Sequence, residues 1–292
     1  MDYIYFKNRF FLVVIVFLLV GLSCDAQPYF DVVSVQTSTA NHSLTNYTGK
    51  EKISLNWFCA NLSFPVKINR SNLLVTTVGY EQFQFEGNGN PLTQNFNSIY
   101  LPLTVLHTWK DTTWNTSFTL IPKVNSYSPL EVNNNTFQAG GAIIATHTIS
   151  SKFKYSFGGY YNREFFGDYF LPLLGLEWKA SERLHVFGLL PNDFTADYRI
   201  KKAWHGGLVY KGVTTSFRYK STALTDYLRM EEGQLKLFSD LYIKKTIALN
   251  LEAGIIVARS YGLKYYDQPQ LYDFSVRESG IFKIGLIYRV WL

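Results

Sequence analysis

Cysteine and methionine are nearly absent from the sequence, with two residues of each among 292 positions. Cys24 lies in an N-terminal segment that we predict to be removed, which leaves Cys59 without an intrachain partner. A secreted domain held together by disulfides is therefore not indicated. Histidine is also scarce, with five residues, and no His-x-His or Cys-x-x-Cys spacing suggests a metal site. We predict no metal and no cofactor.

Beyond residue 26 the sequence also lacks a hydrophobic run long enough for a transmembrane helix. The best candidate, residues 247–257, is interrupted by Asn250 and Glu252. Clustered charge of one sign is missing as well, because the net charge of +6 is spread along the chain. The sequence therefore predicts no membrane-spanning helix and no nucleic-acid partner.

One hydrophobic run does occur at the N-terminus, at residues 10–22, closely preceded by Lys7 and Arg9. It is shorter than the ~20 residues that a membrane span needs, and its length and basic flank are typical of a secretory signal peptide. We predict a signal peptide over residues 1–26, with cleavage before Gln27. Lipoprotein processing at Cys24 is the alternative.

Strand-forming residues are abundant, with 23 Phe and 21 Tyr, and the chain is 17% aromatic. Several segments alternate between apolar and polar residues with a period of two. The clearest is the last one, residues 280–292, whose apolar phase is Phe282, Ile284, Leu286, Tyr288, Val290 and Leu292. Successive side chains of a strand point to opposite faces, so this segment has one face suited to lipid. In a soluble protein such an exposed edge would invite aggregation, whereas in a barrel it closes against the first strand.

Short polar turns and longer loops alternate along the chain, which is the pattern of outer-membrane barrels with tight periplasmic turns and longer external loops. We predict short turns at 110–112, 150–152, 181–183, 201–203 and 244–246, and loops at 41–50, 87–95, 123–136, 162–168, 221–230 and 259–278. The exception is a tight turn at 191–193 on the long-loop side.

The hairpins between the short turns are 29–65, 72–109, 113–149, 153–180, 183–201, 204–244 and 246–291. They predict an all-β fold, a transmembrane antiparallel up-and-down β-barrel of about 14 strands with a polar interior. About 12 strands is the alternative, because the first hairpin and the 204–230 stretch are poorly defined. Residues 27–292 would form this barrel as one domain. A secreted β-sandwich is the soluble alternative, and the aromatic residues on the apolar phases and the lack of disulfides count against it.

The last strand resembles the assembly signal of bacterial outer-membrane proteins. Lys283, Gly285, Tyr288 and Val290 occupy its polar, glycine, aromatic and hydrophobic positions, although the chain ends two residues later instead of on a terminal Phe. Residues 171–193 are similar to a hairpin in uncharacterised outer-membrane barrel families of Gram-negative bacteria. The resemblance implies export to the outer membrane, contact with its lipid and recognition by the barrel-insertion machinery. It implies no particular activity.

Charged residues that oppose the apolar phases are expected to point into the barrel, where charge meets water or a partner. They include Asp197, Arg199, Arg218, Glu252 and Arg289. Two interpretations are open. The charges could line a basic pore that favours anions, or they could form ion pairs that fill a closed lumen.

Four histidines lie close to predicted short turns, namely His107, His147, His185 and His205. Histidine side chains are tolerated at this water interface without forming a shared metal or proton site. A barrel enzyme that hydrolyses lipid would need a strand serine activated by a histidine. His147 and Ser150 are the nearest candidates, but residues three apart on one strand face opposite sides. The sequence therefore predicts no catalytic residue.

The expected role is passive. We predict either a small-solute channel that selects by size and charge or a structural barrel without flux. A lipid-modifying barrel enzyme is one alternative. A ligand-binding or adhesion barrel that uses its external loops, with the tyrosine-rich stretch 259–278 as its surface, is another.

Overall fold

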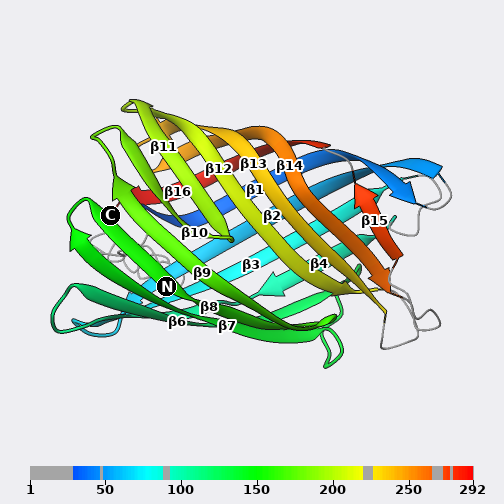
Figure 1. Cartoon of the computed structure of the whole chain (residues 1–292), viewed down its shortest axis with the longest axis horizontal. Coiled ribbons are helices and arrows are strands. Elements are labelled where there is room, and N and C mark those ends of the chain that lie inside the picture. The colour runs from blue at the N-terminus through cyan, green and yellow to red at the C-terminus, as the bar shows by residue number, and fades with distance from the viewer. Residues whose placement is uncertain are drawn as a thin grey trace, which may run out of the picture.

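The computed structural model describes residues 29–46, 49–87, 93–219, 226–264, 272–276 and 279–291, and the predicted signal peptide lies outside these ranges. Within the described ranges every helix or strand found is a strand, and no helix is long and apolar enough to cross a membrane. The strands form a closed barrel of antiparallel neighbours, with its long axis horizontal in Figure 1. The predicted fold class is confirmed.

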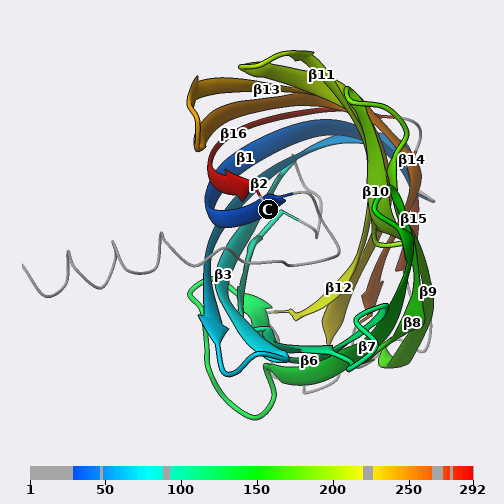
Figure 2. The same cartoon turned by 90° about the vertical axis from the view of Figure 1, so that its left-hand side faces the viewer.

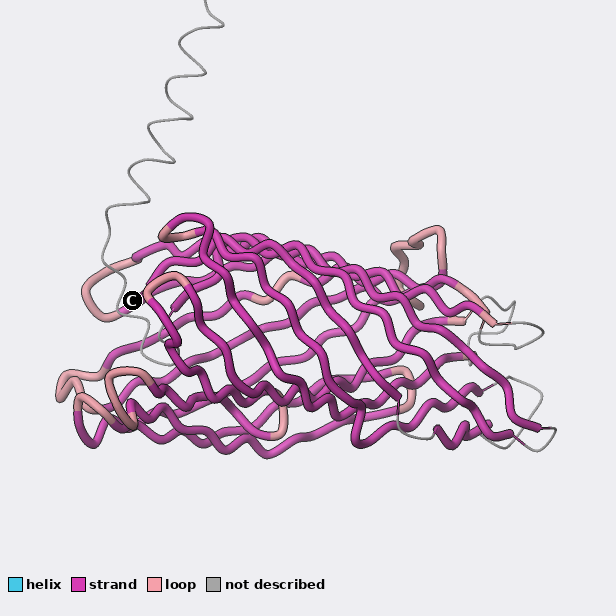
Figure 3. The backbone as a smooth tube through the Cα atoms, turned by 90° about the horizontal axis from the view of Figure 1, so that it is seen from above, coloured by secondary structure: helices cyan, strands magenta, loops and turns pink. Residues whose placement is uncertain are grey.

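The strands follow one another around the wall in chain order, oblique to the barrel axis (Figure 3). They are β1 (Tyr29–Asn46), β2 (Gly49–Lys67), β3 (Asn72–Glu86), β4 (Asn95–Tyr100), β5 (Leu103–Thr108), β6 (Trp114–Tyr127), β7 (Phe137–Ser150), β8 (Phe153–Glu164), β9 (Gly167–Lys179), β10 (Leu184–Leu190), β11 (Asp193–Lys201), β12 (Trp204–Arg218), β13 (Tyr227–Lys244), β14 (Ile247–Lys264), β15 (Tyr272–Val276) and β16 (Ser279–Trp291).

The barrel closes where β16 pairs with β1, from Tyr29 opposite Trp291 to Ala40 opposite Ile281. Segments β4 and β5 are halves of one strand between β3 and β6, interrupted at Pro102, which has no N–H to give to the ladder. Segments β15 and β16 likewise share the place between β14 and β1. The sixteen described segments therefore make a ring of fourteen, as predicted, and the twelve-strand alternative is wrong.

The predicted hairpins match the observed ones, and the tight turn after Leu190 is confirmed by its two-residue link to Asp193. The predicted loops are too long, because strand extends into most of them; residues 41–46 belong to β1, 123–127 to β6 and 259–264 to β14. The backbone hydrogen bonds between the strands continue beyond the last apolar outward residue. The residue types in these segments give no sign of that extension.

The outer surface carries a belt of exposed apolar side chains on successive strands. It includes Phe58, Phe64, Phe118, Leu120, Ile143, Phe157, Phe170, Leu174, Leu237, Ile255 and Leu286. Phe282, Ile284 and Leu286 of the last strand are in this belt, so the predicted lipid-facing phase of that strand does face outward. A continuous apolar band on a closed barrel is what a lipid bilayer requires.

The interior differs between the two ends. At the long-loop end, apolar side chains from β2, β3, β4, β12, β13 and β14 meet in one cluster, which we call the external core. Its buried members are Ile53, Leu55, Phe83, Phe85, Phe96, Phe217, Leu228, Met230, Tyr261 and Leu263. The expectation of a polar interior is wrong for this end, because opposite walls approach closely enough to pack against each other.

Candidate functional site

The outer part of β12 leaves the barrel wall. Up to Lys211 this strand pairs with β11 on one edge and β13 on the other. The β10–β11 hairpin ends at residues 191–192, so from Gly212 to Arg218 the ladder continues to β13 alone, apart from one bridge between Arg218 and Ser126 of β6. Figure 2 shows this end of β12 inside the ring of strands, directed toward β6. A short hairpin thus allows a neighbouring strand to cross the lumen.

Both faces of β12 are consequently buried near its outer end, at Ser216 and Phe217. One face carries Phe217, whose ring centroid lies 5.1 Å from that of Phe83 and 5.3 Å from that of Phe96. Phe83 also stacks on Trp57 at 5.1 Å. Aromatic rings at these separations contribute about 0.5–1.5 kcal/mol per pair beyond their buried area. The external core therefore packs side chains of β2, β3 and β4 against the crossing part of β12.

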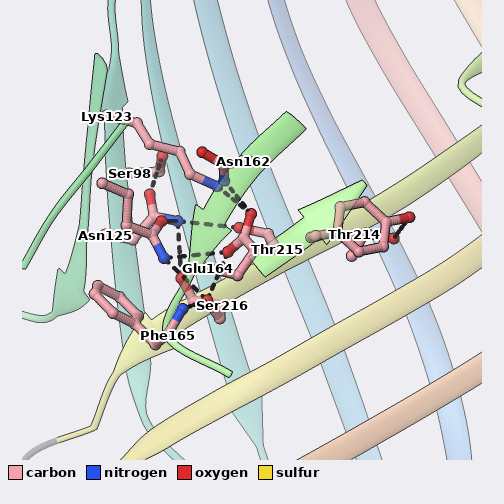
Figure 4. A network of polar contacts seen from close by, with 11 residues as sticks. Ser98, Lys123, Asn125, Asn162, Glu164, Phe165, Thr214, Thr215 and Ser216 are labelled. Carbon is pink, nitrogen blue, oxygen red and sulfur yellow. Dashed lines mark hydrogen bonds and ion pairs between the residues drawn. The ribbon is translucent and has the colours of Figure 1, made fainter. Parts of the chain in front are cut away.

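The other face of β12 meets a polar cluster, which we call the latch and define as Asn125, Gln138, Glu164 and Ser216. Figure 4 labels Asn125, Glu164 and Ser216 of this cluster. The Ser216 hydroxyl donates to Glu164 Oε2 at 2.6 Å and accepts from Gln138 Nε2 at 3.0 Å. It also accepts from the backbone N–H of Phe165 at 2.9 Å. One buried hydroxyl therefore joins β12 to the ends of β7 and β8.

Asn125 joins β12 to β6 in the same way. Its amide Nδ2 donates to the Ser216 carbonyl at 2.8 Å and to Thr215 Oγ1 at 3.0 Å, while its Oδ1 accepts from Ser98 Oγ at 2.6 Å. These bonds satisfy a backbone carbonyl that would otherwise be buried without the partner that a regular ladder supplies.

The charge of Glu164 is compensated within the cluster. Lys123 Nζ lies 2.7 Å from Glu164 Oε1, and the Glu164 side chain is 0% exposed. Asn162 donates a second hydrogen bond to the same oxygen. A fully buried carboxylate is tolerated only with such partners, since removing one of them leaves an uncompensated charge.

Below the external core, the lumen side chains of β1, β13, β14 and β16 form ion pairs. Glu252 lies between Lys236 and Lys283, at 2.8 Å and 2.5 Å. Arg289 pairs with Asp31 and with Asp240, each at 2.6 Å. The structure thus places the predicted charges Glu252 and Arg289 in buried ion pairs inside the barrel.

The other three predicted charges lie in separate places. Asp197 is buried beside His205, with 3.0 Å between Oδ2 and Nδ1. Arg199 is exposed at the short-turn end and donates to the Glu182 carbonyl. Arg218 lies at the tip of β12, where it donates to the Asn135 carbonyl and its guanidinium lies over a phenylalanine ring. The structure brings no two of these three residues together.

The short-turn half of the lumen holds a cavity of about 610 Å³, which we call the vestibule. Its wall is formed by the inward side chains of β5 to β8, such as Thr104, Ser117, Thr146 and Ser156. Small side chains thus leave open the space that aromatic rings fill at the other end.

The four residues of the assembly-signal resemblance are divided between the two faces of β16. Lys283 and Gly285 face the interior, and a Cβ at Gly285 would lie 2.7 Å from Gln36 Cγ of β1. Tyr288 and Val290 share the outward phase of Leu286. The glycine permits close approach of β1 and β16, where the barrel closes. Recognition by the insertion machinery stays a prediction.

The four histidines near the short turns do not meet. His147 packs on Trp114 with ring centroids 4.5 Å apart, His107 bonds to Asn72, His185 lies near Glu177 and His205 near Asp197. Among the described residues no group of His, Cys, Asp and Glu could hold a metal ion. Ser150 accepts from the backbone N–H of Lys152, and no hydrogen bond joins it to His147.

Sequence reasoning missed the external core, the latch and the vestibule. A signal for the core exists in β3, where the apolar phase changes. Val78 and Tyr80 lie on the outward phase, whereas Phe83 and Phe85 lie on the inward one. No comparable signal marks the latch, since its residues come from four separate strands.

Solved structures with a similar fold include an outer-membrane channel from Pseudomonas putida F1, at 10% identity and a TM-score of 0.46, covering 91% of this chain and 98% of that one. The TodX monoaromatic hydrocarbon channel matches at 10% identity and a TM-score of 0.46, covering 89% of each chain. The translocator domain of the autotransporter NalP from Neisseria meningitidis matches at 11% identity and a TM-score of 0.38, covering 98% of this chain and 95% of that one.

These likenesses concern overall architecture and carry nothing about solute or mechanism. None of the curated proteins matches the chain. One family model matches residues 22–289, which is most of the sequence. The chain therefore belongs to the family described as a domain of unknown function, DUF6268, an uncharacterised family with the outer-membrane β-barrel fold.

Proposed function

We propose that this protein is an outer-membrane channel for small solutes that stands closed. The observation that carries the proposal is the external core, in which residues from opposite walls, including Phe83, Phe96 and Phe217, are at most 1% exposed. Water and ions cannot pass through side chains packed to this density. Solute entering the vestibule from the short-turn end, which we assign to the periplasm, would stop at this seal.

The part of β12 from Gly212 to Arg218 is the element that would have to move. It has a ladder on one edge only, and the latch holds its other side through side chains. Side-chain hydrogen bonds can exchange for water, whereas a continuous ladder on both edges would fix the strand in the wall. A channel with a movable barrier accounts for these attachments better than a wall built only for rigidity.

The test is conductance in planar lipid bilayers. Purified wild-type protein is expected to show no steady current. The double variant Phe83→Ser/Phe217→Ser removes two rings of the seal and admits water, so discrete current steps are expected. Phe157→Ala/Phe170→Ala changes two lipid-facing rings and is the matched control, expected to stay silent. Steady wild-type conductance would contradict the closed state. The absence of current steps in the double variant would favour a structural barrel without flux.

A further inference from the structure

The vestibule wall is rich in neutral groups that both donate and accept hydrogen bonds. Thr104 and Thr119 face each other across β5 and β6, with hydroxyl oxygens 2.9 Å apart. Thr146 and Ser156 do the same across β7 and β8, at 2.8 Å. A hydroxyl has one donor and two acceptor positions, so each pair keeps hydrogen-bonding capacity directed at the cavity.

Three polar groups of the wall lie in one row of directly opposed residues. Asn115 of β6 is directly opposite Thr146 of β7, which is directly opposite Ser156 of β8. The next position in this row, on β9, is Gly175. The row therefore presents an amide and two hydroxyls and ends at the glycine, where the backbone of β10 lies close.

The charged side chains of the vestibule are in an ion pair, at its mouth or, for Asp193, hydrogen-bonded to a neutral amide. Lys154 Nζ lies 3.1 Å from Glu177 Oε2. Asp193 accepts from the Asn192 amide at 2.8 Å. Lys67 and Arg70 belong to the exposed rim at the start of the β2–β3 turn. An anionic solute would find Lys154 of the inner wall already paired with Glu177, whereas a neutral solute need not disturb that pair.

We propose that the vestibule binds a small, neutral, polyhydroxylated solute of the sugar class. Its volume of about 610 Å³ lies within the ~300–1,000 Å³ typical of small-molecule sites. Apolar lining residues, including Leu73 and Leu106, and the ring of Tyr29 suit the C–H faces of a sugar, while the hydroxyl pairs suit its edges. The inference rests on the proposed function for the passage of solute, but binding itself occurs with the barrier closed.

The experiment is saturation-transfer NMR with sucrose on the exported protein in a zwitterionic detergent, because maltoside detergents would themselves compete. Wild type is expected to give a saturable sucrose signal, and the anion gluconate is expected to give none. Ser117→Phe fills the cavity and should abolish the signal. Thr146→Val removes one hydroxyl at constant volume and should weaken binding by about 2- to 10-fold.

Thr77→Val is the matched control, since the Thr77 hydroxyl bonds to Ser63 at 2.9 Å in the same manner but does not line the vestibule. The affinity of the Thr77→Val variant for sucrose should equal that of wild type. Heat-modifiable gel migration checks that the Ser117→Phe variant folds. If it does not fold, the sucrose affinity of the Thr146→Val variant tests the proposal. No saturable signal, equal affinity in Thr146→Val, or equal binding of gluconate would overturn the proposal. Bilayer conductance has no bearing on these outcomes, so failure of the channel and failure of the site are distinguishable.

Discussion

The two halves of the lumen are enclosed by the same ring of strands, yet one is packed and the other is open. At the long-loop end the inward positions carry Trp57, Phe83, Phe96 and Phe217, and the rings meet across the barrel. At the short-turn end the inward positions of β5 to β8 are mostly Ser, Thr and Asn, and a vestibule remains. The size of the inward side chains, and not the strand number, decides whether this barrel is open.

The difference also concerns how the backbone is held. In the vestibule wall each strand has a ladder on both edges. In the packed half, the outer part of β12 has one ladder and depends on side chains for the rest. The packed half is therefore the one in which single side-chain changes should have the larger energetic effects.

The largest effect is expected for Phe217→Ala, at about 3–5 kcal/mol of unfolding free energy, because the ring leaves a cavity between its neighbours in the external core. Urea unfolding from lipid vesicles, followed by tryptophan fluorescence, measures the loss. Phe170→Ala is the control on the outer face, where the side chain is 66% exposed and lipid fills the space. Equal losses in the two variants would break the contrast between a packed interior and a lipid-facing belt.

A smaller loss, about 1–3 kcal/mol, is expected for Ser216→Val, because Glu164, Gln138 and the Phe165 N–H each lose a buried partner. The same unfolding assay measures it. Thr214→Val, two residues earlier on the same strand face, removes only a 3.4 Å contact with Tyr169 and should change little. If Thr214→Val proved as damaging as Ser216→Val, the latch would not be what holds β12.

An effect of about 0.2–1 kcal/mol is expected for Arg229→Gln at the long-loop end. Arg229 pairs with Glu231 at 2.6 Å, but the two side chains are 34% and 30% exposed, so water screens the pair. The loss should shrink further in molar salt. Unfolding measured at low and high salt checks this, and a loss that is insensitive to salt would show that the pair is not screened.

The smallest effect is expected for Thr119→Val in the vestibule, within about 0.5 kcal/mol of wild type. Its partner Thr104 lines the same cavity and can bond to water once the Thr119 hydroxyl is gone. The unfolding assay again measures the change. A loss comparable to that of Ser216→Val would mean that the vestibule wall is dry, and the comparison between the halves would fail.

The sequence predicted the strand ring well because its signals are local. Alternation with a period of two marks each strand, and short polar turns such as 201–203 mark each return, so the fourteen-strand ring follows from counting. The tight turn after Leu190 was predicted for the same reason. Strand ends were predicted less well, since 123–127 and 259–264 look like loop once apolar residues no longer occupy the outward phase.

The candidate site could not be predicted because its contacts join strands that are distant in the sequence. Alternation tells that Ser216 and Phe217 face opposite sides, but not that both sides are buried. That depends on the short β10–β11 hairpin, which removes a neighbour from the outer part of β12. The predicted lumen charge Arg218 is affected in the same way and lies at the tip of the strand, over Phe165.

The most direct test of the two-halves account is the reactivity of single cysteines. In a Cys59→Ala background, Ser117→Cys places a thiol in the vestibule and Met230→Cys places one in the external core, where the native side chain is 1% exposed. The background without an added cysteine is the control. The account predicts that a water-soluble maleimide modifies the vestibule cysteine rapidly and the core cysteine orders of magnitude more slowly. Comparable rates at the two positions would contradict it.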